Sequence, residues 1–598
     1  MIDLAQLKPY KSLIITKVKS EVVLSSLVNE IMDDLMECLE IGPTSKRQLV
    51  NRFDVFEDGS LTIGVMHYRE ECQPSWTFEV SIQDNVNHLI IICAQRQYVS
   101  IFLSDPKRKH PVTNRILQDG DHDLKSLELI SQGLLNAAFV KGPTRTLWLS
   151  GTHRQTSIKP NNKILSGLDL RDALDPLGDQ TYHFTAARCV PVASVIPEPV
   201  GISPRKSQVW TGPSKTWDDF RYIVSKILSQ VESTTIPINA PLPVIAISSP
   251  EVSQVFGPFD IAIVPPELLA DDSSLDEETR QEMELWGYQS NFEILEANEN
   301  KFVSEVSLKG QVLGKIKFDL DIAPYKPVSW KVSESFCESG QEKLYEEAFK
   351  LVQRKAWVKI WFESGHTISN GEIFEVRHRD TPFVDITWAN LNGYHVKTEK
   401  PEPLAKIGGQ KSLFDWMLNY WPNFDQSNID PGGWLASDDG SMEIADFIHL
   451  NDRTMPPILT LVHVKGSGSD DDHRTISVSD YEVVTSQAVK NLRYLDRLLL
   501  SEGLKNGIEK MIGTLVWHDR VQSTRDDMIL ALSKIGSNHQ RRIFIFQPRL
   551  TKTSHDKARQ SNQCSDFARL RQLDTLLLSA AASCKGLGVE FRVIGDQR

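Results

Sequence analysis

The sequence has no paired cysteines, no long apolar run and no glycine-rich phosphate loop, and each absence excludes a class of protein. The seven cysteines are scattered through 598 residues and never form a CxxC pair, which argues against a zinc ribbon, a disulfide framework and a thioredoxin-like site. No stretch reaches the roughly 18 apolar residues that a membrane helix needs. Neither an ATP-binding P-loop nor a GxGxxG dinucleotide loop occurs. We therefore expect a soluble, cytoplasmic protein that has no membrane partner and no motor of its own.

Composition and charge describe an ordinary globular protein. Hydrophobic residues make up 40% and charged residues 24% of the chain, as in folded domains. The net charge of −13 argues against a surface that is basic along its whole length, although local patches can still contact phosphate. Residues 541–598 hold eleven Lys and Arg against five Asp and Glu, whereas acid gathers in 267–284. The acidic segment is a candidate docking site for a protein partner, such as a helicase supplied in trans.

Length and hydrophobic patterning predict a multidomain protein built of α/β and α+β units. At about 150 residues per domain, three or four domains are expected. The segment 190–214 is rich in proline, serine and glycine and reads as a linker. The predicted units are an N-terminal α/β domain that could act as a recognition module, a middle α/β domain, a β-rich connecting domain and a C-terminal unit, at 1–190, 191–325, 326–402 and 403–598.

The C-terminal unit alternates helices and strands, an order typical of a mixed or parallel sheet covered by helices on both faces. The sequence predicts, in order, a helix at 412–420, strands at 442–450 and 458–465, a helix at 480–500, a strand at 514–518, a helix at 525–535, a strand at 542–547, a helix at 568–582 and a strand at 589–594.

Chemistry-bearing residues gather in the second and third of these elements. Asp446 interrupts an apolar strand, where a carboxylate costs several kcal/mol unless it is paired, hydrogen-bonded or bound to a cation. His463 and Lys465 are two positions apart at the end of the next strand, so they project from one face. Adjacent strands would bring the three together. An acid there can hold a divalent cation, which activates water, and a lysine can stabilise the charge that develops on a phosphate.

The predicted helix 480–500 adds a polar stripe. Gln487, Lys490, Asn491 and Tyr494 fall at helical spacing, on a helix that is otherwise apolar or charged. Gln487 is suited to support the site, and Lys490 and Tyr494 are candidates to contact a nucleic-acid backbone.

This arrangement resembles the PD-(D/E)XK nuclease superfamily, whose core is a helix, three strands, a helix and a strand. Over about 150 of the 598 residues, Asp446 matches the acid of the second strand, Lys465 the lysine of the third and Gln487 the glutamine of the following helix. His463 stands where the family has Glu or Asp. The resemblance implies Mg²⁺ or Mn²⁺ as cofactor, with Mn²⁺ at least as effective because histidine is a softer ligand. It also implies Asp446 and His463 as metal ligands, with a second acid among Glu443, Asp439 and Asp415.

The resemblance implies a restriction-endonuclease-like fold in the C-terminal unit and a metal-dependent nuclease that cuts nucleic acid, DNA in preference to RNA. Such an enzyme on a large accessory body is typical of a restriction or antiphage-defence effector. Two alternatives stay open. The chain could be a non-catalytic nucleic-acid-binding or assembly subunit with a degenerate nuclease fold, which the histidine favours. Asp446 could also form a metal-free buried ion pair with Lys465, beside a satisfied core histidine at 463.

A second polar region lies at 149–188. Arg154, Lys159 and Lys163 are predicted to contact phosphate from a long loop system, since loops on a scaffold often carry function. The alternative is a turn-rich connector whose charges are solvated.

Overall fold

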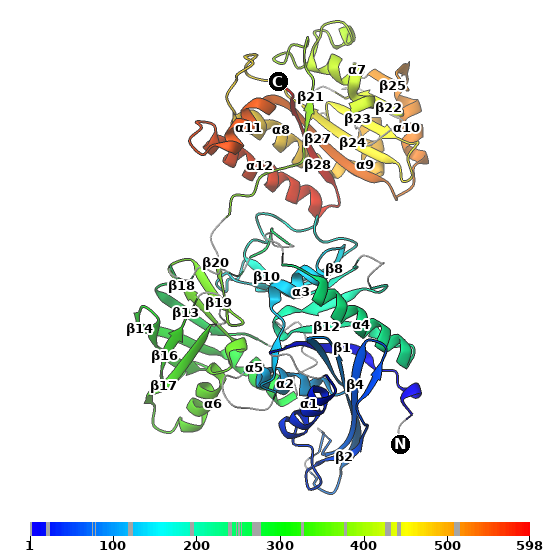
Figure 1. The fold of residues 1–598 in the computed structure, drawn as a ribbon. Coiled ribbons are helices and arrows are strands. Elements are labelled where there is room, and N and C mark those ends of the chain that lie inside the picture. The colour runs from blue at the N-terminus through cyan, green and yellow to red at the C-terminus, as the bar shows by residue number, and fades with distance from the viewer. Residues whose placement is uncertain are drawn as a thin grey trace. The chain divides into compact units, whose positions relative to one another are not determined.

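A computed structural model gives the fold of the chain (Figure 1). The residues that it describes are 3–19, 24–74, 76–77, 79–117, 124–191, 196–236, 242–246, 248, 252, 254–265, 277–323, 328–375, 379–424, 432–438, 444–506 and 515–598. Within these ranges the protein is a multidomain mixture of α-helices and largely antiparallel sheets. No described helix is both long and apolar enough to cross a membrane.

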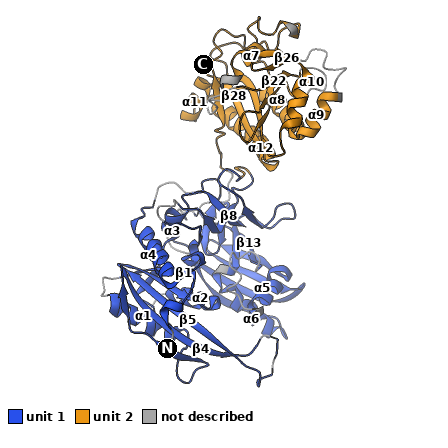
Figure 2. Cartoon of the chain, turned by 90° about the vertical axis from the view of Figure 1, so that its right-hand side faces the viewer, with its two compact units in different colours: residues 1–174, 178–378 blue, residues 175–177, 379–598 orange. Residues whose placement is uncertain are grey.

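The chain divides into two compact units, shown in different colours in Figure 2. Unit 1 comprises residues 1–174 and 178–378, and unit 2 comprises 175–177 and 379–598. This division is coarser than the four domains that the sequence suggests. The segment 190–214 is not a simple linker, because β11 (Val200–Ser203) and β12 (Gln208–Pro213) pair with each other, with β10 and with β1 and so extend the first sheet.

The first sheet of unit 1 has twelve strands. Apolar side chains of α1 (Leu24–Cys38) and α2 (Lys109–Ile116) cover one face, and those of α3 (Gln132–Phe139) and α4 (Trp217–Ser233) cover the other. Its other strands are β1 (Tyr10–Val18), β2 (Arg47–Arg52), β3 (Phe56–Asp58), β4 (Leu61–Cys72), β5 (Asp84–Gln95), β6 (Tyr98–Leu103), β7 (Leu127–Leu129), β8 (Thr144–Gly151), β9 (Asn162–Ser166) and β10 (Tyr182–Cys189).

The second sheet of unit 1 has eight strands, and α5 (Glu277–Gln289) and α6 (Glu342–Val352) pack on its core. It meets the first sheet through polar contacts: Lys359 Nζ donates to Gly151 O at 2.7 Å, and Trp361 Nε1 donates to Thr152 O at 3.0 Å. Its strands are β13 (Pro258–Ile263), β14 (Ser290–Asn298), β15 (Lys301–Leu308), β16 (Gln311–Asp321), β17 (Ser329–Cys337), β18 (Val358–Phe362), β19 (His366–Ser369) and β20 (Glu372–Glu375).

Unit 2 is built on one mixed sheet in the order β21-β28-β27-β24-β23-β22-β25-β26. The strands β22, β23 and β24 form an antiparallel meander, and β27 runs parallel to β24. The strands are β21 (Ile386–Ala389), β22 (Trp434–Ser437), β23 (Phe447–Asn451), β24 (Ile458–Val464), β25 (Leu515–His518), β26 (Val521–Ser523), β27 (Gln540–Thr551) and β28 (Glu590–Asp596).

Helices cover both faces of this sheet, as the sequence predicts. Core side chains on one face pack with α7, and those on the other pack with the remaining helices of the unit. The helices are α7 (Leu413–Phe424), α8 (Val478–Lys490), α9 (Arg497–Asn506), α10 (Arg525–Lys534), α11 (Lys552–Gln560) and α12 (Phe567–Gly586).

One helix prediction for unit 2 is wrong. The segment 480–500 is not continuous, because α8 ends at Lys490 and a 3-10 turn, Leu492–Leu495, precedes α9. The break falls at Asn491, whose side-chain amide donates to Ile444 O at 2.8 Å, a contact with a loop far away in the sequence. Asn491 and Tyr494 therefore do not continue the helical stripe that begins at Gln487.

Candidate functional site

The ends of β22, β23 and β24 bring three buried polar side chains into one row. Ser437 pairs with Phe447, and Phe447 pairs with Val462. Continuing these registers by one residue places Asp438 opposite Asp446, and Asp446 opposite His463. The backbone agrees, because Asp438 N donates to Asp446 O at 3.2 Å.

The same face of the sheet carries all three members of this row, Asp438, Asp446 and His463. Alternate residues of the three strands, including Ala436, Ile448 and Leu461, belong to the core that packs against α8. Because side chains alternate along a strand, the row continues that α8-facing set. Asn491, just after α8, contacts the loop immediately before Asp446 through Ile444 O.

Asp446 lies immediately before β23 and is 3% exposed. Its Oδ2 accepts a hydrogen bond from the backbone N–H of Val464 at 2.7 Å. That bond holds the carboxylate against the end of β24 and partly offsets the cost of burying it. The predicted proximity of Asp446 to the His463–Lys465 segment is therefore found.

His463 is the most unusual side chain of the row. It is 0% exposed, and neither Nδ1 nor Nε2 has a hydrogen-bond partner among the described residues. Burial, with a smaller contribution from Lys490, lowers the pKa of His463 from 6.5 to about 3. The imidazole is therefore neutral at physiological pH, which is the form that can donate a lone pair to a metal.

Asp438 is a site residue that sequence reasoning missed. It follows β22 directly, is 6% exposed, and its Oδ2 accepts from Ile444 N at 3.0 Å. The signal in the sequence is a pair of acids immediately after the apolar run Trp434–Ser437, but only the register shows that Asp438 faces Asp446.

Lys465 lies one residue beyond β24, at the edge where the sequence places it. Its side chain is 43% exposed, and Nζ is 2.9 Å from Glu399 Oε2. Glu399 also accepts from Gly466 N at 3.2 Å, so it holds the turn after the strand. Glu399, like Asp438, is thus an acid near the site that the sequence did not suggest.

The predicted residues of the following helix lie in different settings. Gln487 is half-buried on α8, and Lys490 is exposed in its last turn. Tyr494 lies in the 3-10 turn, where its hydroxyl accepts from Arg493 at 2.8 Å. The effect of Lys490 on the pKa of His463 places a positive charge near the row.

The alternative acids differ in what the structure says of them. Asp415 is 1% exposed, and its carboxylate accepts from Gly408 N, from Ser412 N at 2.7 Å and from Ser412 Oγ. It therefore organises the start of α7, the helix that packs on the opposite face from α8. Glu443 and Asp439 lie outside the described residues.

The cations predicted at 149–188 have protein partners, two within these loops and one on β13. Arg154 is ion-paired with Asp260, and Lys163 Nζ is 2.8 Å from Asp179. Lys159 Nζ donates to Gly178 O at 2.9 Å. These contacts give the three side chains structural partners, and a role in phosphate contact stays a prediction.

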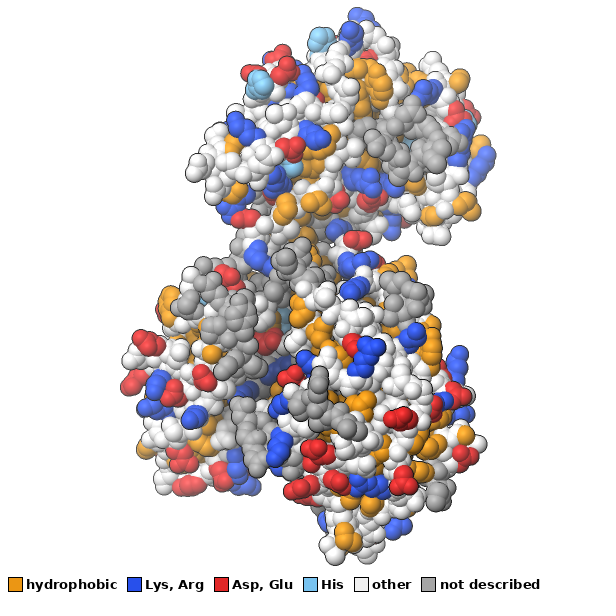
Figure 3. Space-filling view, viewed as in Figure 1, with side chains coloured by type: hydrophobic (Ala, Val, Ile, Leu, Met, Phe, Trp, Pro, Cys, Tyr) orange, Lys and Arg blue, Asp and Glu red, His pale blue; other side chains and the backbone are white. Residues whose placement is uncertain are grey.

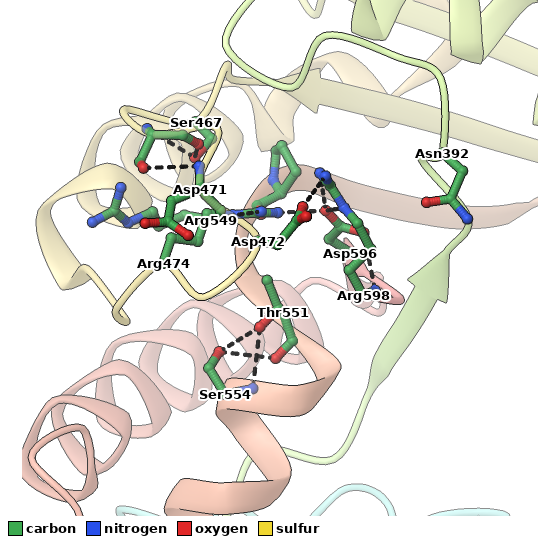
Figure 4. Close-up of polar contacts among 12 residues, drawn as sticks. Asn392, Ser467, Asp471, Asp472, Arg474, Arg549, Thr551, Ser554, Asp596 and Arg598 are labelled. Atoms are coloured by element: carbon green, nitrogen blue, oxygen red, sulfur yellow. Dashed lines mark hydrogen bonds and ion pairs between the residues drawn. The ribbon is translucent and has the colours of Figure 1, made fainter.

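The sheet end beside the row is held by a buried ion pair (Figure 4). Arg474 and Asp596 are both 0% exposed and are paired with each other, and Arg474 Nε also donates to Pro548 O at 2.9 Å. Arg598 Nε donates to the same aspartate at 2.8 Å. Every charge in this cluster has a partner, in contrast to the unbonded nitrogens of His463.

The donor set of the row, two carboxylates and a neutral imidazole, fits a divalent cation such as Mn²⁺. The ligand atoms of the three residues in the row do not all lie within 4.8 Å of one another. Among the described residues, Glu70, His88 and Asp105 in unit 1 are the one group of three whose ligand atoms all lie within 4.8 Å of one another. Glu70 there is ion-paired with Arg47 and Arg108, at 3.0 and 2.8 Å, so cations of the protein already occupy that position.

The surface charge of the described residues does not mark a nucleic-acid-binding face. On the face drawn in Figure 3, acidic and basic side chains are interspersed over the described surface, without a broad field of one sign. Neither a family model nor a curated protein matches the chain.

Proposed function

We propose that unit 2 is a metal-dependent nuclease that hydrolyses phosphodiesters of nucleic acid, DNA in preference to RNA. The observation that carries the proposal is the row Asp438–Asp446–His463, in which the strand register aligns a buried neutral imidazole with two unbonded nitrogens and two buried carboxylates. Burying such nitrogens without partners costs free energy, about 1–3 kcal/mol per group, and a bound cation would remove part of that cost.

The order of elements supports the same proposal. A helix (α7), three antiparallel strands (β22 to β24) and a helix (α8) follow one another along the chain, and a strand parallel to β24 (β27) comes after α9, β25, β26 and α10. This is the order of the PD-(D/E)XK core that the sequence resembles. The likeness supports a restriction-endonuclease-like fold for unit 2 and, by analogy, a restriction or antiphage-defence role in which unit 1 serves recognition.

Each side chain has a role in this proposal. Asp446, Asp438 and His463 would hold Mg²⁺ or Mn²⁺, which supplies charge neutralisation at the phosphate and activation of water. Lys465, released from Glu399, would stabilise negative charge on the scissile phosphate. Gln487 would position the substrate from α8, and Lys490 would contact the backbone of the nucleic acid.

Cleavage of single- and double-stranded DNA and RNA with Mn²⁺ or Mg²⁺ tests the proposal. Asp446→Asn keeps an acceptor for Val464 N–H but removes the charge, and Lys465→Met removes the ammonium; each is expected to lower the rate at least a hundredfold. Asp526→Asn and Lys505→Met change exposed residues on α10 and α9 and serve as matched controls. Cleavage that persists in both site variants would overturn the proposal.

A second candidate function is a non-catalytic nucleic-acid-binding or assembly subunit that works with a partner in trans. The ion pair between Lys465 and Glu399 and the open spacing of the row favour it. It predicts nucleic-acid binding that is equal in wild type and Asp446→Asn, with no cleavage in either.

A further inference from the structure

Unit 1 contains a cavity of about 770 Å³ on its first sheet, and the nuclease proposal does not use it. Drug-sized ligands occupy pockets of roughly 300–1,000 Å³, so the volume suits a molecule of that size. Its floor comes from β1, β8, β10 and β12, and α2 contributes a wall. Trp148, Ala186 and Trp210 are out of phase with the α4-side core residues Leu147, Ala187 and Val209, so they project from the opposite face.

The cavity has an aromatic part. The indoles of Trp148 and Trp210 line it and lie 6.4 Å apart at 69°. Trp210 is fixed in place, because it lies directly over Gly201: a Cβ at that glycine would come within 2.0 Å of the ring. Two half-buried indoles, one of them held against Gly201, offer a surface for a flat ring.

The cavity also has a cationic part. Lys8, Lys109 and Arg188 line it, and no Asp or Glu occurs among the described lining residues. Lys109 is 5% exposed and donates from Nζ to Ser12 Oγ at 2.5 Å, whereas Lys8 and Arg188 are exposed. A described lining that holds cations and no carboxylate favours an anionic ligand.

A polar group that the fold leaves unused completes the set. Gln208 is 3% exposed and lines the cavity, yet its side-chain amide makes no hydrogen bond within the described part of the chain. Buried amides are ordinarily hydrogen-bonded, so this one has donors and an acceptor available to a ligand.

We propose that this cavity binds a nucleotide, with the base against Trp148 and Trp210, its edge bonded to Gln208, and the phosphate held by Lys8, Lys109 and Arg188. The separation of an aromatic wall from a cationic one matches the two halves of a nucleotide. The nucleotide could be a free molecule or the end of a strand, since both present the same chemistry. This inference does not depend on cleavage by unit 2.

Isothermal titration calorimetry on the full chain tests the proposal with ATP, AMP, adenosine, tripolyphosphate and a four-nucleotide DNA. ATP, AMP or the oligonucleotide should bind, and adenosine and tripolyphosphate should each bind at least tenfold more weakly. Binding of ATP and AMP identifies a free nucleotide as the ligand, and binding of the oligonucleotide alone identifies a strand end. Either result supports the proposal.

Two variants locate the binding site. Trp210→Ala should lower the affinity about tenfold through lost stacking, and Arg188→Gln should lower it and weaken its salt dependence. Trp76→Ala and Arg96→Gln, both exposed and outside the cavity, are the matched controls and should bind as wild type does. Thermal unfolding of every variant establishes that it is folded. The proposal would be overturned if no nucleotide bound at millimolar concentration. It would also be overturned if Trp210→Ala and Arg188→Gln both bound as tightly as wild type.

Discussion

Two buried histidines, one in each unit, have similarly lowered pKa values but differ in hydrogen bonding. Burial lowers the pKa of both His183 and His463 to about 3. His183 lies between the two sheets of unit 1, with Nε2 3.1 Å from Ser369 Oγ and its ring stacked 4.3 Å from Phe374. His463 has no hydrogen bond to either nitrogen.

The difference separates a histidine that packing explains from one that packing does not. The hydrogen bond and ring contact of His183 explain why it is buried between the two sheets of unit 1. His463 is buried without a hydrogen bond to any described residue, which costs free energy, and the strand register aligns it with Asp446. A site that is arranged for a ligand is expected to show this kind of local cost.

Replacing Arg474 should have the largest effect on stability, because its charge is buried and is paired with the buried carboxylate of Asp596. Arg474→Met leaves the buried Asp596 with Arg598 alone, and the free energy of unfolding should fall by about 3 kcal/mol. Urea unfolding measures this change. Arg493→Met, an exposed arginine of the same unit, should change it by less than about 0.5 kcal/mol. Equal stability of wild type and Arg474→Met would show that the pair contributes nothing.

The next largest effect is expected at the satisfied histidine. His183→Leu removes the partner of Ser369 Oγ and the stack on Phe374, so the free energy of unfolding should fall by about 1–3 kcal/mol. Differential scanning calorimetry at neutral pH would report the change. A variant as stable as wild type would remove the contrast between the two histidines.

His463→Leu should act in the opposite direction. An apolar side chain of similar size removes two unbonded polar nitrogens, so the metal-free protein should keep its stability or gain about 1 kcal/mol. The same calorimetric scan, with a chelator present, provides the measurement. A loss of more than about 2 kcal/mol would mean that His463 is an ordinary structural residue.

A further effect, read as a difference between two variants, is a slope of stability with pH. An unfolded histidine takes up a proton below about pH 6.5, whereas folded His463 does so only near pH 3, so acid favours the unfolded state between these values. Each pH unit in that window should cost up to about 1.4 kcal/mol. The stability advantage of His463→Leu over wild type should therefore grow as the pH falls from 6.5. An advantage independent of pH would contradict the lowered pKa of the buried imidazole.

Local patterns predict several elements of unit 2, but not β21, β22, β26 or α11. Apolar alternation and helical spacing identified β24, α7 and α12, and the strand end placed Asp446 near His463. These elements follow from residues close together in the chain, where periodicity is informative.

Several of the failures involve contacts between distant segments. The break after α8 coincides with the contact of Asn491 with Ile444, and the pairing of β12 with β1 involves a strand far upstream. Asp438 was missed because its place opposite Asp446 follows from strand register, which single-sequence patterns do not fix.

Titration of the metal-free protein with Mn²⁺ by calorimetry tests the central claim most directly, because it asks whether the row Asp438–Asp446–His463 holds a cation. One Mn²⁺ per chain should bind to wild type and to His183→Leu, and His463→Leu and Asp446→Asn should each lose at least tenfold in affinity. Equal Mn²⁺ binding by wild type and both row variants, or none by wild type, would contradict the account.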